Sequence, residues 1–182
     1  RLDRIDQEMD QAKQDQWIQI ASVQPNIPFN KHDLPPKERG NNLQSTIDLT
    51  QKVMHDNPET NLVVWPELPL IMVCQDESTQ DIENLVKAIN CPLIYNCSRR
   101  AGEDQYYNAA VFLSPAGESN FEYHKRLLFP FGEYLPFRRF FSYLGLTTPD
   151  FLKTAHGKTP SVFDMGLNQK IIPSLCYESV FS

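Results

Sequence analysis

The sequence has 182 residues, 41% of them hydrophobic and 11% aromatic, which is enough for one buried core and excludes a wholly disordered chain. Its 17 basic and 23 acidic residues give a net charge of -6, which argues against nucleic acid as the main partner. The longest apolar run, residues 62–74, is interrupted by Glu67 and two prolines and falls short of the ~20 residues that a membrane span requires.

The first 16 residues are polar and charged, and we interpret them as a linker or N-terminal extension leading into a domain at residues 17–182. The chain begins at Arg1 without an apolar leader and ends at Ser182, shortly after an apolar run. We therefore expect both ends to be cuts inside a longer protein, so that the domain is truncated at its C-terminus.

Within this domain, short apolar runs bounded by turn residues predict strands, and apolar residues at helical spacing predict helices. The predicted strands span residues 17–23, 61–65, 92–97, 107–114, 121–124, 161–166 and 171–176. The predicted helices span about residues 37–56 and 82–89, and residues 129–160 are predicted to be rich in loops. This alternation indicates an α/β sheet with helices packed on it.

The four cysteines and four histidines are scattered, with no CxxC pair and no spacing typical of a zinc site. If Cys91 and Cys97 share one strand, they lie on one face of it but ~20 Å apart, too far for a disulfide. We therefore expect neither a structural metal nor a disulfide scaffold. The cysteines leave the redox compartment open.

Three chemically distinctive residues follow apolar strands: Glu67, Lys125 and Cys176. Each alone has an ordinary explanation, as a loop carboxylate, a solvated charge or a small core residue. Together they supply a base, a cation and a nucleophile at the strand ends, where α/β sheets collect reacting groups. We expect the three side chains to converge on one cavity.

A cysteine nucleophile needs activation, because a free thiol with a pKa of about 8.5 is mostly protonated at neutral pH. If a helix starts after Cys176, the N–H groups of Tyr177 and Glu178 would stabilise a thiolate there. Glu67 would remove the thiol proton, and Lys125 would stabilise the charge on a carbonyl oxygen during attack. The predicted chemistry is acyl transfer through a thioester.

Four segments resemble the carbon–nitrogen hydrolase (nitrilase) superfamily and, within it, the extracytoplasmic domain of apolipoprotein N-acyltransferases. They are VVWPELPL, YNAAVFLSPAG, YHKRLLFPFGEYLPF and SLCYES, in the order of that family. The third is the most specific, because relatives that act on small soluble amides lack its aromatic extension. The resemblance implies a nitrilase-like α-β-β-α sandwich.

The resemblance also implies the functional residues. The implied catalytic residues are Glu67 as general base, Lys125 at the oxyanion, Glu133 as a second glutamate beside the triad, and Cys176 as nucleophile. Tyr177 and Glu178 match active-site positions next to the nucleophile and are expected to bind substrate.

The implied reaction has two half-reactions. The thiolate takes a fatty acyl chain from a membrane phospholipid and leaves a lysophospholipid. The acyl group then passes to the α-amino group of the lipid-modified N-terminal cysteine of an apolipoprotein. No cofactor or metal is implied, and the domain would lie on the periplasmic side of the inner membrane.

Residues 129–143 contain seven aromatic side chains without helical or strand periodicity, which predicts a loop. With the preceding Lys125 and Arg126 included, four cations against one carboxylate give a local charge of +3: Lys125, Arg126, Arg138 and Arg139 against Glu133. We expect the region to contact the membrane and the lipid substrate through Phe137, Phe140 and Phe141. Full burial of these three side chains against the sheet would exclude this role.

Two alternatives stay open beside the N-acyltransferase. One is a soluble nitrilase or amidase that hydrolyses a small carbon–nitrogen substrate with the same Glu-Lys-Cys triad. The other is a catalytically silent module that binds lipid or a partner protein, against which the intact triad argues. Family members carry membrane helices before this domain and further elements after the nucleophile, so we expect the isolated chain to be inactive.

Overall fold

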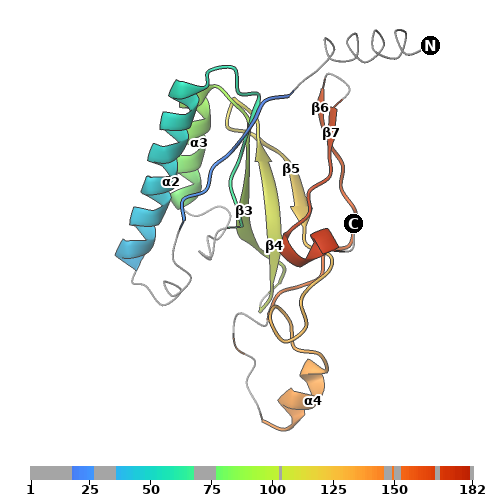
Figure 1. Ribbon diagram of the computed structural model, residues 1–182. Helices are drawn as coiled ribbons and strands as arrows, with labels where there is room; N and C mark the ends of the chain where they lie inside the picture. Colours follow the sequence, from blue (N-terminus) through green and yellow to red (C-terminus); the bar gives the residue numbers. More distant parts are fainter. Residues whose placement is uncertain are drawn as a thin grey trace, which may run out of the picture.

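The computed structural model describes residues 18–26, 36–67, 77–102, 104–145, 149, 153–166 and 169–180 (Figure 1). The predicted extension at residues 1–16 lies outside the described residues. The elements in chain order are β1 (Ile20–Ser22), α2 (Pro36–Asp56), β2 (Leu62–Val64), α3 (Glu77–Ile89), β3 (Leu93–Arg100), β4 (Tyr106–Leu113), β5 (Ser119–His124), α4 (Arg138–Tyr143), β6 (Phe163–Gly166), β7 (Gln169–Ile171) and the 3-10 helix η3 (Cys176–Val180). None of the helices in this described part combines the length and apolar character that spanning a bilayer requires.

A five-stranded sheet in the order β1-β2-β3-β4-β5 forms the centre of the fold. Strands β1, β2 and β3 are parallel, and the helices α2 and α3 lie between them in the chain. Strands β4 and β5 continue the sheet with antiparallel pairing. The carboxyl ends of β2 and β5, where Glu67 and Lys125 follow, are therefore brought to one region of the sheet edge.

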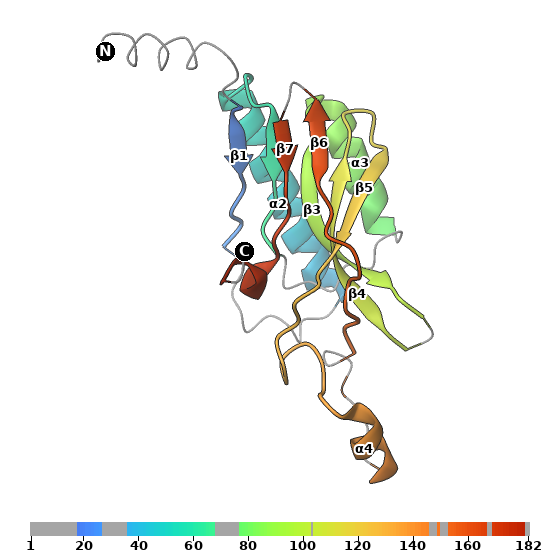
Figure 2. The same cartoon turned by 90° about the vertical axis from the view of Figure 1, so that its right-hand side faces the viewer.

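Different layers cover the two faces of the sheet (Figures 1 and 2). Helices α2 and α3 pack on one face, and the apolar side of α3 is buried there through Ile82, Leu85 and Val86. The β6–β7 hairpin forms a separate two-stranded sheet over the opposite face. These helix, sheet and hairpin layers agree with the nitrilase-like α/β fold that the sequence predicts.

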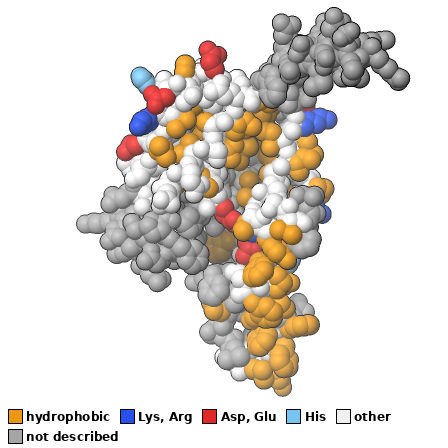
Figure 3. All heavy atoms as spheres, viewed as in Figure 1, with side chains coloured by type: hydrophobic (Ala, Val, Ile, Leu, Met, Phe, Trp, Pro, Cys, Tyr) orange, Lys and Arg blue, Asp and Glu red, His pale blue; other side chains and the backbone are white. Residues whose placement is uncertain are grey.

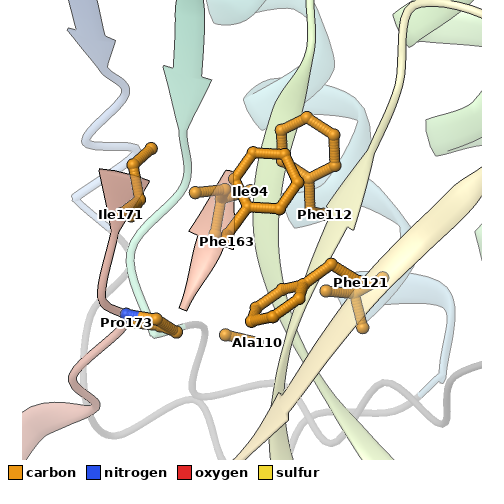
Figure 4. Close-up of a pocket in the computed structure, with 8 residues that line it drawn as sticks. Ile94, Ala110, Phe112, Phe121, Phe163, Ile171 and Pro173 are labelled. Atoms are coloured by element: carbon orange, nitrogen blue, oxygen red, sulfur yellow. The ribbon is translucent and has the colours of Figure 1, made fainter. Parts of the chain in front are cut away.

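An aromatic core joins the hairpin to the sheet (Figure 4). The ring centroid of Phe163, on β6, lies 3.7 Å from that of Phe112 and 5.4 Å from that of Phe121. Ile171 of β7 packs against the same cluster. The gap between these side chains has a volume of about 10 Å³, so the two layers are closely packed here.

The last predicted strand, residues 171–176, is wrong. Strand β7 ends at Ile171, and residues 172–175 have no regular structure. Pro173 has no N–H group with which to extend the pairing. Cys176 therefore follows an irregular segment after the hairpin and does not end a strand of the central sheet.

The predicted loop at residues 129–143 contains one short helix, α4. The N–H groups of Phe140 and Phe141 donate to the carbonyl of Phe137, at 2.8 and 3.4 Å, and start this helix. Helix α4 lies on a projection that extends away from the sheet (Figures 1 and 2). Hydrophobic side chains gather along the projection in the space-filling view (Figure 3).

The expectation that no disulfide supports the fold was wrong for Cys97, which is disulfide-bonded. The narrower prediction that Cys91 does not bridge Cys97 is confirmed, because Cys91 is a free, buried thiol. Spacing along one strand excludes a partner on that strand, but it carries no information about partners elsewhere in the chain. Cys176 is free and exposed.

Candidate active site

Glu67 follows β2 on a segment that Trp65 anchors. The Trp65 indole Nε1 donates a buried hydrogen bond to Thr50 Oγ1 of α2 at 3.0 Å, and its backbone N–H donates to Ile94 O at 2.9 Å. These two bonds fix the direction in which the chain leaves the sheet. The Glu67 side chain is 34% exposed, and its Oε1 accepts a hydrogen bond from Asn108 Nδ2 at 2.6 Å.

Lys125 is the buried cation of the site, with 1% of its surface exposed. Its Nζ donates to Glu133 Oε1 at 2.7 Å and lies 3.9 Å from Glu67 Oε1. The other Glu133 oxygen, Oε2, accepts from the N–H of Phe129 at 2.8 Å, which holds the carboxylate in place. A buried ammonium is tolerated when it is paired, and two carboxylates provide that pairing here.

Cys176 and Glu67 line the same cavity, which has a volume of about 390 Å³. Most of its wall is apolar and includes Leu62, Val64 and Ile94. The backbone φ of Cys176 is 49°, a left-handed conformation that is uncommon for residues other than glycine. The structure thus brings Glu67, Lys125 and Glu133 into a charged cluster and places Cys176 on the cavity that Glu67 borders.

The five-residue helix η3 begins at Cys176. The N–H of Glu178 donates to Leu175 O at 3.2 Å, so it is not available to a thiolate, and this part of the expectation was wrong. The Ser179 hydroxyl donates to Cys176 O at 2.8 Å and tightens the turn. One 3-10 turn also lacks the aligned peptide dipoles of a longer α-helix.

The buried carboxylate of Glu178 connects the segment after Lys125 to the segment before Cys176. Oε1 accepts from Tyr123 OH at 2.7 Å, Arg126 N at 2.7 Å and Leu127 N at 2.9 Å, and Oε2 accepts from Leu175 N at 3.1 Å. Glu178 was expected to contact substrate. In the structure both oxygens accept hydrogen bonds from the protein, and the residue holds the segments next to Lys125 and Cys176 together.

The protonation states follow from these contacts. Burial raises the pKa of Glu178, but hydrogen bonds from Leu127 N, Tyr123 OH, Leu175 N and Arg126 N outweigh burial and lower the pKa below its usual value. Burial, the hydrogen bond to Glu178 and the charge of that carboxylate raise the pKa of Tyr123 to about 12. At neutral pH the pair is therefore a carboxylate bonded to a neutral phenol.

The aromatic residues expected at the membrane are not all buried. Phe137 and Phe140 are 83% and 60% exposed, and Phe141 is partly exposed, so burial against the sheet does not exclude a surface role. The ring of Tyr177 meets that of Phe129 edge to face at a centroid distance of 5.3 Å. This contact joins the turn that carries Cys176 to the start of the aromatic projection. The side chains of Arg138 and Arg139 lie outside the described set.

Sequence reasoning missed two asparagines. Asn108 and Asn96 form a hydrogen-bonded chain that ends on Glu67. A signal was present, since asparagine is unfavourable inside a strand and each one interrupts an apolar run. An amide kept at such a position indicates a specific partner.

The layers and strand order define a nitrilase-like α/β fold, and solved structures share it. The NitN amidase from Neterenkonia sp. AN1 has a TM-score of 0.55 and 16% identity over 88% of this chain and 55% of that one. Saccharomyces cerevisiae Nit3, a member of the nitrilase superfamily, has a TM-score of 0.52 and 18% identity over 72% of this chain and 48% of that one. The carbon–nitrogen hydrolase family profile matches residues 19–182, and the chain belongs to this family.

Curated relatives share the name apolipoprotein N-acyltransferase. The chain is 31% identical to the protein of that name from Rickettsia typhi and 29% identical to that from Vibrio parahaemolyticus. Each match covers 90% of this chain and 33% of the relative. The chain thus spans about one third of the length of these relatives.

Proposed function

We propose that the complete protein is an N-acyltransferase that moves a fatty acyl chain from a phospholipid to the N-terminal amine of an apolipoprotein. The observation that carries the proposal is the Glu67–Lys125–Glu133 cluster beside a cavity that Cys176 also lines. The names of the curated relatives support this choice of donor and acceptor.

The first half-reaction forms a thioester. Glu67 accepts the proton of the Cys176 thiol, and the sulfur attacks the ester carbonyl of the phospholipid. The ammonium of Lys125 stabilises the negative charge that develops on the carbonyl oxygen. As the C–O bond breaks, Glu67 returns the proton to the leaving alkoxide, which departs as a lysophospholipid.

The second half-reaction transfers the acyl group to the amine. The α-amino group of the apolipoprotein attacks the thioester carbonyl, and Glu67 accepts a proton from the nitrogen. The C–S bond breaks, the product amide leaves, and the proton passes from Glu67 to the sulfur of Cys176.

The exposed aromatic side chains support a membrane as the source of the acyl donor. Within residues 129–143, Phe131, Phe137 and Tyr143 are 68%, 83% and 88% exposed. Exposed apolar surface of this extent is typical of contact with lipid or another apolar partner. Tyrosine and phenylalanine suit the interface between headgroups and acyl chains.

The disulfide at Cys97 supports a location outside the cytoplasm. Structural disulfides persist in oxidising compartments such as the bacterial periplasm and are rare in the cytosol. This agrees with a domain on the periplasmic side of the inner membrane.

The thioester can be tested in the complete protein, reconstituted in vesicles of phospholipid with a labelled acyl chain and no acceptor. We expect the protein to carry a label that hydroxylamine releases. Cys176→Ala should abolish the label, whereas Cys91→Ala, which removes another free thiol, should retain it. Adding a peptide with a lipid-modified N-terminal cysteine should then move the label to the peptide amine.

The same experiment separates the alternatives. Label that survives in Cys176→Ala would contradict the proposed nucleophile. Hydrolysis of short soluble amides without acyl labelling would favour a soluble amidase. Lipid binding with neither reaction would favour a silent binding module.

A further inference from the structure

Asn108, on β4, contacts all three charged residues of the candidate active site. Its Nδ2 donates to Glu67 Oε1 at 2.6 Å and lies 3.5 Å from Glu133 Oε1. Its backbone carbonyl accepts from the N–H of Lys125 at 2.8 Å. One residue therefore connects the proposed base, the proposed oxyanion cation and the carboxylate that pairs with that cation.

Asn96, on β3, fixes the orientation of the Asn108 amide. Asn96 is 7% exposed, and its Nδ2 donates to Asn108 Oδ1 at 2.5 Å and to Ala109 O at 3.0 Å. The strand register pairs Ser98 with Asn108, which makes Asn96 and Asn108 diagonal neighbours on one face of the sheet. A reversed Asn108 amide would set its oxygen against two carboxylates and its NH₂ against that of Asn96. Only the observed orientation gives the Asn108 NH₂ group a carboxylate acceptor and the Asn108 oxygen a donor from Asn96.

The two polar contacts described for Glu67 both involve one carboxylate oxygen. Asn108 Nδ2 and Lys125 Nζ each approach Oε1, at 2.6 and 3.9 Å. Lys125 is closer to Glu133, at 2.7 Å, so the shorter contact on Glu67 comes from a neutral donor. A neutral amide fixes a carboxylate without neutralising the charge that a general base needs.

We propose that Asn108, held by Asn96, is a positioning residue that fixes Oε1 of Glu67 and thereby presents Oε2 to the thiol of Cys176. This inference rests on the proposed function of Glu67 as general base. Its consequence is that proton transfer depends on the direction in which one amide points. The charges of Glu67, Lys125 and Glu133 alone do not set the rate of this proton transfer.

The decisive variant is Asn108→Asp, which keeps the size of the side chain and the acceptor for Asn96 but replaces the donor facing Glu67. Two oxygens would then repel each other across the contact. We expect acylation of Cys176 in the complete protein to slow by about 100-fold at about pH 8. Asn120→Asp is the matched control, because Asn120 is exposed on β5 and the substitution adds the same charge.

The pH dependence separates an orienting donor from a merely structural residue. The new carboxyl would face Glu67, Glu133, Lys125 and the amide of Asn96, and two carboxylates against one ammonium favour its protonated form. Once protonated, the introduced carboxyl group donates to Glu67 again. The rate relative to wild type should therefore rise by about tenfold or more between about pH 8 and pH 6.

Asn96→Ala provides a second, milder test. The Asn108 amide then loses its orienting partner, and we expect acylation to slow by about tenfold. Adding Asn96→Ala to Asn108→Asp should cost little more than Asn108→Asp alone, because both act through one contact.

Two results for Asn108→Asp would overturn the inference: a wild-type rate, or a slowed rate whose ratio to wild type is the same at both pH values. The proposed function would still stand as long as the wild-type protein becomes labelled. An unlabelled wild type would overturn both. If Asn108→Asp does not fold, Asn96→Ala decides, and a wild-type rate in that variant overturns the inference.

Discussion

Replacing Glu178 with glutamine tests whether its carboxylate holds the active-site segments together. The glutamine Oε1 can still accept from Tyr123 and the N–H groups of Arg126 and Leu127, but without charge assistance. Its NH₂ group meets the N–H of Leu175, so one buried donor loses its acceptor. With one bond lost and three weakened, we expect a cost of about 3 kcal/mol to local stability.

That cost should appear in amide hydrogen exchange of the complete protein. About 3 kcal/mol corresponds to about 100-fold faster exchange for segments opened by the substitution. The effect should be confined to peptides that contain Arg126, Leu127 and Leu175. Glu118→Gln, at an exposed position in the β4–β5 turn, is the matched control. Protection of these amides at the wild-type level in Glu178→Gln would refute the reasoning.

The same contact predicts a pH dependence. The pKa of Glu178 is lowered in the fold, by hydrogen bonds that outweigh the opposing effect of burial. Its contribution to stability is therefore present above the pKa of an unfolded glutamate and is lost as the pH falls through the lower folded pKa. Wild-type protection at Leu127 should decline in that acidic range, and the glutamine variant should show no such step.

Three other substitutions probe different parts of the structure. Glu133→Gln removes the negative charge that lies 2.7 Å from buried Lys125, and we expect Cys176 acylation to fall at least about 100-fold, measured with the labelled phospholipid; a near-wild-type rate would contradict the charge pairing. Phe137→Asn suits the φ of 57° and removes an 83% exposed ring, so vesicle affinity should drop about tenfold while the melting temperature stays unchanged; unaltered vesicle binding would exclude Phe137 from the membrane contact. Gly157→Ala would place a Cβ in steric overlap with the His124 carbonyl oxygen, and a loss of about 2 kcal/mol should lower the melting temperature; an unshifted melting curve would show that the backbone yields without cost.

The sequence predicted helices and strands well in segments where the apolar residues follow a clear helical or strand pattern. The spacing of Leu43, Ile47, Thr50 and Met54 predicts the helix observed as α2, and the run at residues 107–114 predicts β4 within one residue. The failure at residues 171–176 has a clear cause. The apolar run that contains Pro173 packs its side chains without forming strand hydrogen bonds. Composition alone does not distinguish such a packed irregular segment from a strand.

The sequence singles out ionisable residues of the candidate site but not its two asparagines. Glu67, Lys125 and Cys176 each follow an apolar run, so their position relative to the predicted strands drew attention to them. The role of Asn108 depends on its contacts with Glu67 and Glu133, which lie on other segments of the chain. Contacts of this kind form only in the assembled fold, and the local pattern around Asn108 does not encode them.

The proposed nucleophile and its proposed base belong to different layers of the sandwich. Glu67 extends from the central sheet, whereas Cys176 follows the hairpin, which the contact between the rings of Phe112 and Phe163 joins to that sheet. Sliding of one layer over the other would alter the sulfur-to-carboxylate separation directly. A change in side-chain volume at Phe163, which is remote from any reacting atom, would therefore shift one layer relative to the other and misalign the reacting groups. Selection for catalysis thus acts on this aromatic core as well as on the site.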